Sequence, residues 1–150
     1  MEEAPLRLRH YFITRIHIKA HSKYNPKKPY IYEAGSIQTE QKVYVNKKIP
    51  GVWQVRLNLK NVQRNSENIP YTFNLEIVGF FETTKKHTKS TTDMFIHFNA
   101  PAILYSAARE IIASATGRGP WGSILIPVIR FLPQLRKIPK TGKKSRKKTK

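Results

Sequence analysis

Residues 6–20 read LRLRHYFITRIHIKA, and the alternation in this stretch decides the fold class. The even-numbered positions are mostly apolar, as at Leu8 and Ile16, whereas the odd-numbered positions include the charged Arg7 and Lys19. A period of two with one apolar face is typical of a half-buried antiparallel strand. We therefore expect residues 6–20 to form a strand whose even-numbered side chains face the core.

Three further stretches predict strands. Residues 53–59 read WQVRLNL and residues 71–81 read YTFNLEIVGFF, and in each an apolar side chain recurs at nearly every second position. Between the first two runs, residues 34–46 predict one more strand around Val43–Val45. Short alternating runs of this kind favour an antiparallel sheet of four strands.

Helical periodicity begins only after these runs. Residues 90–98 predict a short turn of helix, and Asn99 predicts the N-cap of the next helix, with Pro101 in its first turn. From there apolar residues recur at a spacing of three or four, and Gly117 predicts a left-handed C-cap. Strands followed by helices indicate an α+β fold, in which helices pack on one face of a four-stranded antiparallel sheet.

Positive charge is concentrated at the end of the chain. The 150 residues carry 28 Lys plus Arg against 9 Asp plus Glu, a formal charge of +19. The last fifteen residues hold nine of these bases and no acid: Arg136, Lys137, Lys140, Lys143, Lys144, Arg146, Lys147, Lys148 and Lys150. We predict a folded domain over residues 1–135 and a disordered basic tail over 136–150, which either binds polyanions through counterion release or only solubilises the chain.

The sequence offers little for catalysis or metal binding. There is no cysteine, and Asp93 is the sole aspartate, so we expect no disulfide, no metal site, no cofactor and no enzymatic activity. Residues 117–122 match G-x-G-x-x-G, but they end a predicted helix instead of opening one after a strand. The apolar run at 124–129 is far shorter than the about 20 residues of a membrane span, and the acidic start does not resemble a signal peptide, so a cytoplasmic location is expected.

One family pattern runs along most of the chain. Residues 99–110 read NAPAILYSAARE and resemble the helix signature C-P-N-I-L-F-P-Y-A-R-E of the SecB export chaperones. Residues 118–121 (RGPW) and 125–131 (LIPVIRF) follow in the order of that family's R-G-S/T-F-P and L-A-P-V-N-F motifs. Upstream, residues 52–57 are similar to its V-Y-E-V-x-L strand and 73–81 to its strand ending in G-G-I-F. The resemblance covers the chain up to about Phe131.

The resemblance implies an activity. SecB proteins are four-stranded antiparallel sheets with helices on one side, assembled as a dimer of dimers. They hold unfolded client proteins in apolar grooves without ATP and pass some of them to the secretion motor, and some relatives protect one client such as an antitoxin. The implied function is therefore that of an ATP-independent chaperone whose partners are unfolded polypeptides.

A chaperone of this kind needs apolar surface left open beside a stable sheet. The candidates lie in the crossover after the first strand, around the second and third strands, and in the loop after the helix: Tyr24, Tyr30, Ile31, Tyr32, Tyr44, Ile49, Trp53, Trp121, Ile124 and Leu125. For each, packing in the core or between subunits is the alternative. The long strand at 6–20 also needs a partner for its unpaired backbone, so at least a dimer is expected.

Three departures from the family pattern matter. Tyr105–Ala107 stands where the family has Phe-Pro-Tyr, and Pro133 followed by the basic tail occupies the place of a second helix. The sheet face that is acidic in the family and docks the secretion motor would here carry bases: Arg7, Arg9, Arg15, Lys19, Arg56 and Lys60. Because like charges repel, the resemblance alone does not imply handover to the standard motor, which stays a possible partner against which the charge argues.

Two other functions fit the same residues. A basic sheet face with aromatic residues, together with the tail, could bind nucleic acid by stacking and charge, although no RNP-like motif or recognition helix is visible. The chain could also be an oligomeric scaffold that has no client.

Overall fold

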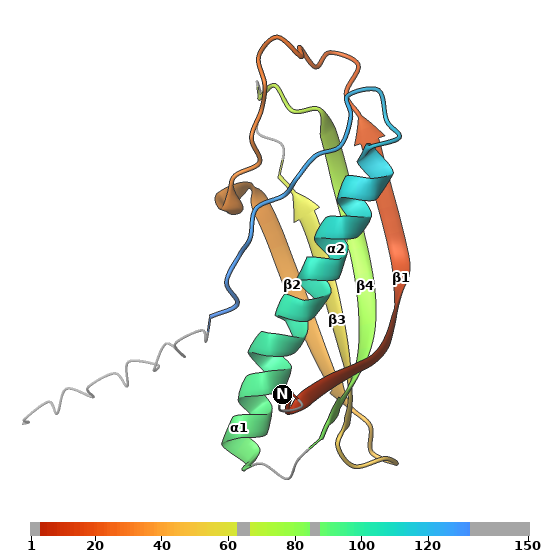
Figure 1. The fold of residues 1–150 in the computed structure, drawn as a ribbon, viewed down its shortest axis with the longest axis vertical. Coiled ribbons are helices and arrows are strands. Elements are labelled where there is room, and N and C mark those ends of the chain that lie inside the picture. Colours follow the sequence, from red (N-terminus) through yellow and green to blue (C-terminus); the bar gives the residue numbers. More distant parts are fainter. Residues whose placement is uncertain (1–3, 63–66, 85–87, 133–150) are drawn as a thin grey trace, which may run out of the picture.

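Four strands form one antiparallel sheet in the computed structural model, which describes residues 4–62, 67–84 and 88–132. The spatial order is β1-β4-β3-β2 (Figure 1), and the strands are β1 (Leu6–Ala20), β2 (Ile37–Val45), β3 (Val52–Asn61) and β4 (Tyr71–Thr83). A rod made of α1 (Lys89–Met94), a π-helical turn (Phe95–Asn99) and α2 (Ala100–Thr116) lies across one face of this sheet. The predicted α+β fold is confirmed.

The two central strands hold the core. In β3 and β4 the residues that face the helix are almost fully buried, among them Val55, Leu57, Leu75 and Ile77. Leu104, Ala108 and Ile112 of α2 pack against them from above. Gly79 permits this close packing, because a Cβ at that position would lie 2.6 Å from Cδ2 of Leu104.

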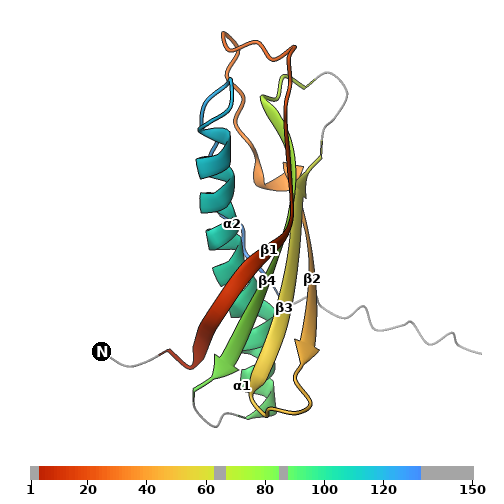
Figure 2. The same ribbon diagram turned by 90° about the vertical axis from the view of Figure 1, so that its right-hand side faces the viewer.

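The edge strand β1 does not keep its alternation. Its pairing with β4 shifts between Leu8 and His10 and again between Ile13 and Arg15. Each bulge inserts one residue and reverses the side-chain direction, so Phe12 lies on the outer face and Tyr11 on the helix face. The prediction that all even-numbered residues of 6–20 face the core was therefore wrong in the middle of the strand, and Figure 2 shows the bend that results.

The helical rod is continuous where a boundary was predicted. Thr88 caps α1 by accepting a hydrogen bond from the Thr91 amide, and Asn99 is helical without capping α2. Pro101 has no N–H to offer the carbonyl of His97 four residues earlier, and the π-helical turn lies at this point. The side chain of Gln41 in β2 donates to that carbonyl at 3.0 Å instead, so Gln41 links the rod to the sheet.

The end of α2 also differs from expectation. Gly117 was predicted as a left-handed cap, but its φ is −58° and its amide continues the helical bonding to Ala113. The chain reverses with tighter turns and takes a positive φ only at Gly122, at +78°. Residues 123–132 then run back over the helix-covered side of the sheet (Figure 1, blue). We call residues 123–132 the return segment.

β1 and β2 lie at opposite edges, so their connection must cross the sheet. Residues 21–36, here called the crossover, arch over one end of the molecule and reach β2 through a 3-10 turn at Ala34–Ser36 (Figure 1). The predicted basic tail, including all nine of its bases, lies outside the described residues. None of the described helices has the length and apolar character needed to cross a membrane.

Candidate functional site

The crossover is tied to the sheet by Tyr32. Its ring is buried, and its hydroxyl donates to the carbonyl of Tyr71 at 2.8 Å while accepting from the amide of the same residue at 3.1 Å. Tyr30 packs edge-on against Tyr32, with ring centroids 5.1 Å apart. Burial raises the pKa of Tyr32 above its ordinary value. These contacts make Tyr32 a structural residue that offers no surface to a partner.

Trp121 ties the loop after α2 to the same end. Its indole N–H donates to the carbonyl of His21 at 2.9 Å, and its amide donates to the Tyr71 hydroxyl at 2.9 Å. Tyr71 in turn donates to the carbonyl of Thr116 at 3.2 Å, and Tyr24 stacks edge-on against the indole at 5.3 Å. We call this network, together with Tyr32, the crossover lock.

The other predicted residues divide between core and surface. Ile124 is buried and Trp53 packs against the core, whereas Tyr44 and Ile49 are exposed at β2 and the β2–β3 turn. The most exposed members of the predicted set are Ile31 at 81% and Leu125 at 70%. The structure therefore brings Tyr24, Tyr30, Tyr32 and Trp121 together at the crossover end and leaves the rest dispersed.

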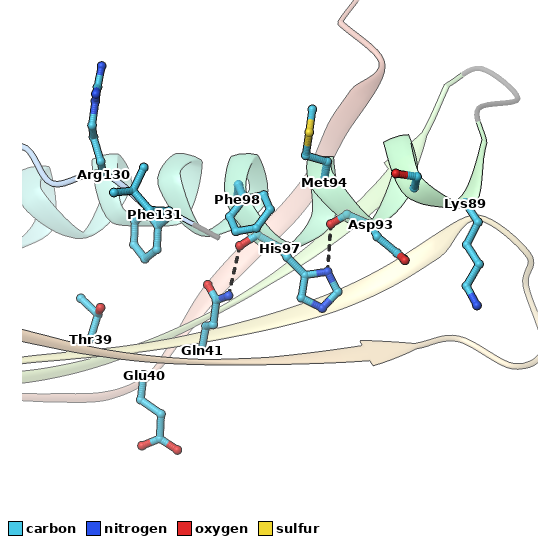
Figure 3. A pocket seen from close by; sticks show the side chains of 12 residues that line it. Thr39, Glu40, Gln41, Lys89, Asp93, Met94, His97, Phe98, Arg130 and Phe131 are labelled. Carbon is cyan, nitrogen blue, oxygen red and sulfur yellow. Dashed lines mark hydrogen bonds between the residues drawn. The ribbon is translucent and has the colours of Figure 1, made fainter. Parts of the chain in front are cut away.

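An open groove lies at the other end, between the helical rod and β2. Its volume is about 1250 Å³, and its walls come from β2, α1, the π-helical turn and the end of the return segment (Figure 3). Phe131 points toward β2 and Phe98 lies along the rod (Figure 3), and Met94 and Leu132 extend the apolar lining with 54% and 67% of their surfaces exposed. We call this the β2 groove.

Polar groups mark the side of the groove nearest the strand. Gln41 bonds the His97 carbonyl, and the His97 ring in turn bonds the carbonyl of Asp93 at 2.9 Å (Figure 3). The side-chain oxygen of Gln41 is buried, and among the described residues it has no partner. Four charged residues also line the groove, the basic Lys89 and Arg130 and the acidic Glu40 and Asp93. The site therefore combines an apolar lining with a few fixed polar atoms and with charges of both signs.

The return segment adds an apolar ridge that continues from the groove. Ile124 and Ile126 point into the core, whereas Leu125, Val128 and Leu132 point outward, and the latter two are 74% and 67% exposed. The helix holds the segment by its backbone: the Arg109 Nε donates to the carbonyl of Ile126 at 2.8 Å, and the Tyr105 hydroxyl donates to the carbonyl of Pro127 at 2.7 Å. Burial raises the pKa of Tyr105 to about 12, and Arg109 lowers it in part.

Sequence reasoning missed the residues that line the groove. Met94, Phe98, Phe131 and Leu132 were not among the candidates, and the outward position of Val128 was not recognised either. The available signal was the repetition of apolar residues through 124–132, whose density exceeds what a covered loop needs.

Both edges of the sheet present backbone groups for pairing. β2 forms the wall of the groove and has a strand neighbour on one side only. β1 forms the opposite edge and carries exposed Tyr11, Ile13 and Ile16 on its helix-facing side, with 43%, 40% and 48% of their surfaces open. An uncovered edge with apolar side chains is a template for another strand.

The residues described in the structure contain no group of three or more His, Cys, Asp or Glu side chains that could hold a metal ion.

The family model described as preprotein translocase subunit SecB matches residues 7–135. Among curated proteins none matches the sequence. Among solved structures, a SecB-like chaperone of Mycobacterium tuberculosis in complex with a ChAD peptide from the HigA1 antitoxin matches with a TM-score of 0.64 at 16% identity, over 83% of this chain and 91% of that chain. A protein of unknown function from Streptococcus agalactiae matches with a TM-score of 0.48 at 9% identity, over 81% of this chain and 96% of that chain.

Proposed function

This chain belongs to the SecB family, and from that premise we propose that it is an ATP-independent chaperone that holds unfolded polypeptides. The observation that supports this most directly is the β2 groove, where Phe98, Phe131 and Leu132 leave apolar surface open beside an unpaired strand edge. Burial of apolar side chains is non-directional, so such a surface accepts many sequences. Holding requires no catalytic group and no cofactor.

A stretched client would bind in two ways at once. Its backbone would pair with the free edge of β2, which gives affinity without sequence preference, and its alternate side chains would enter the groove. The ridge of Leu125 and Val128 would extend the contact along the return segment. Ile31 in the crossover is the other strongly exposed residue of the predicted set and would serve a longer client.

The charge of the chain favours clients with acidic segments. In the groove itself Lys89 and Arg130 are balanced by Glu40 and Asp93, but the whole chain carries +19. The similar Mycobacterium tuberculosis protein was solved with a peptide of an antitoxin. We propose that this chain likewise serves one dedicated client, such as an antitoxin, and that the basic sheet face does not receive the standard secretion motor.

We further propose a cytoplasmic homo-oligomer of at least two copies. The exposed Tyr11, Ile13 and Ile16 lie at the β1 edge, and pairing of two β1 strands would cover them and satisfy the open backbone groups. Sedimentation at micromolar concentration should show a dimer or a larger species. A strictly monomeric species would contradict the proposal.

The chaperone function is tested by suppression of aggregation of a chemically unfolded client. Met94→Glu and Leu132→Glu place charges in the groove at exposed positions, so they should leave stability within about 0.5 kcal/mol of the parent. Each variant should need several times more protein than the parent for the same suppression. Ile49→Glu is the matched control, since Ile49 is 51% exposed but does not line the groove.

The result that would overturn the proposal is a folded parent chain that suppresses no aggregation at a near-stoichiometric ratio. Equal loss in all three variants would move the client site away from the groove, because it would show that any added acid weakens binding to a basic chain.

A further inference from the structure

The face of the sheet opposite the helical rod is open and carries a stack of rings. His10 and Phe80 are stacked at a centroid distance of 4.7 Å and an interplanar angle of 18°, and Phe12 lies 5.9 Å from Phe80. The two bulges in β1 place His10 and Phe12 on this face, opposite Phe80 and Val78. Phe12 remains 46% exposed, although an ordinary alternation would have directed it to the core side.

The strand register continues this stack across the sheet. The row through His10 and Phe80 ends at Tyr44 in β2, so a row spanning all four strands, about 14 Å wide, carries a ring on β1, β4 and β2. The next row leads from Phe12 to Arg56, whose guanidinium carbon lies 5.9 Å above the Tyr44 ring. Three rings of one row and a guanidinium of the next row thus lie on the same face of the sheet.

Positive charge on this face exceeds negative charge. Glu82 pairs with Arg7 and Arg9, and Glu40 pairs with Lys42. Glu76 accepts a hydrogen bond from the Thr14 hydroxyl at 2.6 Å. Among the described residues Arg15, Lys19, Arg56 and Lys60 form no ion pair. Arg56 lies in the row of Phe12 and Arg15 in the next row, whereas Lys60 and Lys19 follow further along the same face, so a polyanion that runs along the strands could contact all four.

We propose that this outer face binds single-stranded RNA, with two or three bases stacked on Phe12, Phe80 and Tyr44 and the phosphates paired with Arg56 and Lys60. Some RNA-binding domains use a four-stranded sheet, with helices behind it, whose open face presents aromatic rings and basic side chains to unpaired nucleobases. Asn58 and Asn74 bond each other at 2.9 Å next to the ring rows and keep further amide atoms for base edges or 2′-hydroxyls. This activity is separate from client holding, since the β2 groove lies on the helix side of the sheet.

An acidic polypeptide is the competing occupant. It would use the cations but would gain little from a stack of flat rings, whereas every nucleobase has a face that stacks. The ring stack therefore favours RNA over an acidic polypeptide as the occupant, and the experiment compares these two ligands directly.

The experiment measures binding of the full chain to a fluorescein-labelled single-stranded RNA of about 12 nucleotides at several salt concentrations. Phe12→Leu removes the ring but keeps an apolar side chain, and should weaken binding about tenfold or more, whereas Phe12→Tyr keeps the ring and should bind like the parent. Arg56→Gln should reduce the steepness of the salt dependence by about 0.7, the share of one phosphate contact on a single strand. All variants retain residues 136–150, so a contribution of the tail is the same in each.

Parallel arms use single-stranded DNA of the same sequence and poly-glutamate. RNA binding by Phe12→Leu at parental affinity would overturn the proposal, and so would displacement of the RNA by poly-glutamate at equal charge concentration. Equal or tighter binding of DNA would overturn the assignment to RNA. Phe12→Leu and Phe12→Tyr should both suppress client aggregation like the parent, so that a failed RNA test leaves the chaperone proposal unaffected.

Discussion

At the crossover end, Tyr32, Tyr71 and Trp121 are partly or wholly buried, and their polar atoms hydrogen-bond to carbonyl, amide and hydroxyl groups of other elements. At the other end of the rod, Phe98 and Phe131 line an open groove and are only partly buried. The two regions use similar aromatic side chains, but tyrosine and tryptophan have a polar handle and phenylalanine has none. Hydrogen bonds from the tyrosine and tryptophan side chains hold the crossover end in one arrangement. The phenylalanine side chains of the groove form no such bonds, so we expect that end to be more adaptable.

This difference suggests a division of labour. The crossover lock joins β4, α2, the loop after α2 and the crossover, so we expect it to contribute to the stability of the whole fold. The walls of the β2 groove come from β2, α1, the π-helical turn and the return segment, and α1 has no buried residue. We therefore expect the groove to change shape at a lower free-energy cost than the crossover lock. Substitutions in the lock should therefore alter global stability, whereas those in the groove should alter local order and client binding.

The largest effect is expected from Gly119→Ala, which breaks the lock. A Cβ at this position would lie 2.6 Å from the Tyr71 hydroxyl, and that ring cannot move because it is buried and bonds Thr116 and Trp121. Overpacking of this kind costs about 2–3 kcal/mol. Urea unfolding followed by tryptophan fluorescence measures it.

Gly35→Ala is the matched control, because a Cβ there meets no atom within 4 Å. An equal loss of stability in both variants would show that the lock is not special. At temperatures where Gly119→Ala is still folded, its client holding should match that of the parent.

High pH should weaken both ends through two tyrosines. Burial raises the pKa of Tyr105 to about 12 and also raises that of Tyr32 above its ordinary value of 10.0. The folded state thus keeps protons that the unfolded state loses, so stability is complete below pH 10 and falls as the pH rises toward 12. The slope is at most about 1.4 kcal/mol per pH unit for each tyrosine.

Unfolding midpoints measured between about pH 9 and about pH 11.5, the range in which tyrosines ionise, report this loss. Tyr105→Phe should flatten the curve, because it removes one of the two raised pKa values, although it also removes the hydrogen bond to the Pro127 carbonyl at 2.7 Å. An unchanged slope in Tyr105→Phe would contradict the assignment.

The sequence predicted the central sheet well for a physical reason. In β3 and β4 both neighbours are strands and one face is packed, so burial forces a strict period of two, as Val55, Leu57, Leu75 and Ile77 show. In β1 only one neighbour fixes the strand, and the bulges after Leu8 and Ile13 cannot be read from the alternation of residue types. The helix boundary at Asn99 failed because Pro101 is accommodated by a side chain from β2, which is a long-range contact.

The candidate site was harder to predict than the fold. Aromatic residues in the crossover indicated an open surface, but Tyr32 proved to be buried and bonded to Tyr71, which lies 39 positions away. Hydrogen bonds between residues so far apart in the sequence leave no signal in the local sequence pattern. The exposure of return-segment residues such as Val128 depends on the hydrogen bonds by which Arg109 and Tyr105 hold the backbone of that segment. These bonds form only once the helix has folded against it.

A smaller effect should come from Gln41→Glu at the groove. Glutamate has nearly the same shape but cannot donate a hydrogen bond, so the carbonyl of His97 would lose its partner and face a negative charge. The expected loss is about 1 kcal/mol. Gln38→Glu is the control, since it adds the same charge on the exposed outer side of the same strand. Equal unfolding midpoints for the two variants would show that the bond across the groove contributes nothing.

The smallest effect is expected from Thr88→Ala, which removes the cap of α1 and so loosens one wall of the groove. The threonine oxygen accepts from the Thr91 amide at 3.3 Å, a long bond, so the loss should be about 0.5 kcal/mol, at the low end for N-caps. The change should be local: hydrogen exchange at Thr91 and Thr92 should speed up, while amides of β4 keep their protection. Thr88→Ser retains the oxygen and should restore the slow exchange. Faster exchange throughout β4 would show that the groove end and the crossover lock unfold as one unit, and the division between a rigid and an adaptable end would then be wrong.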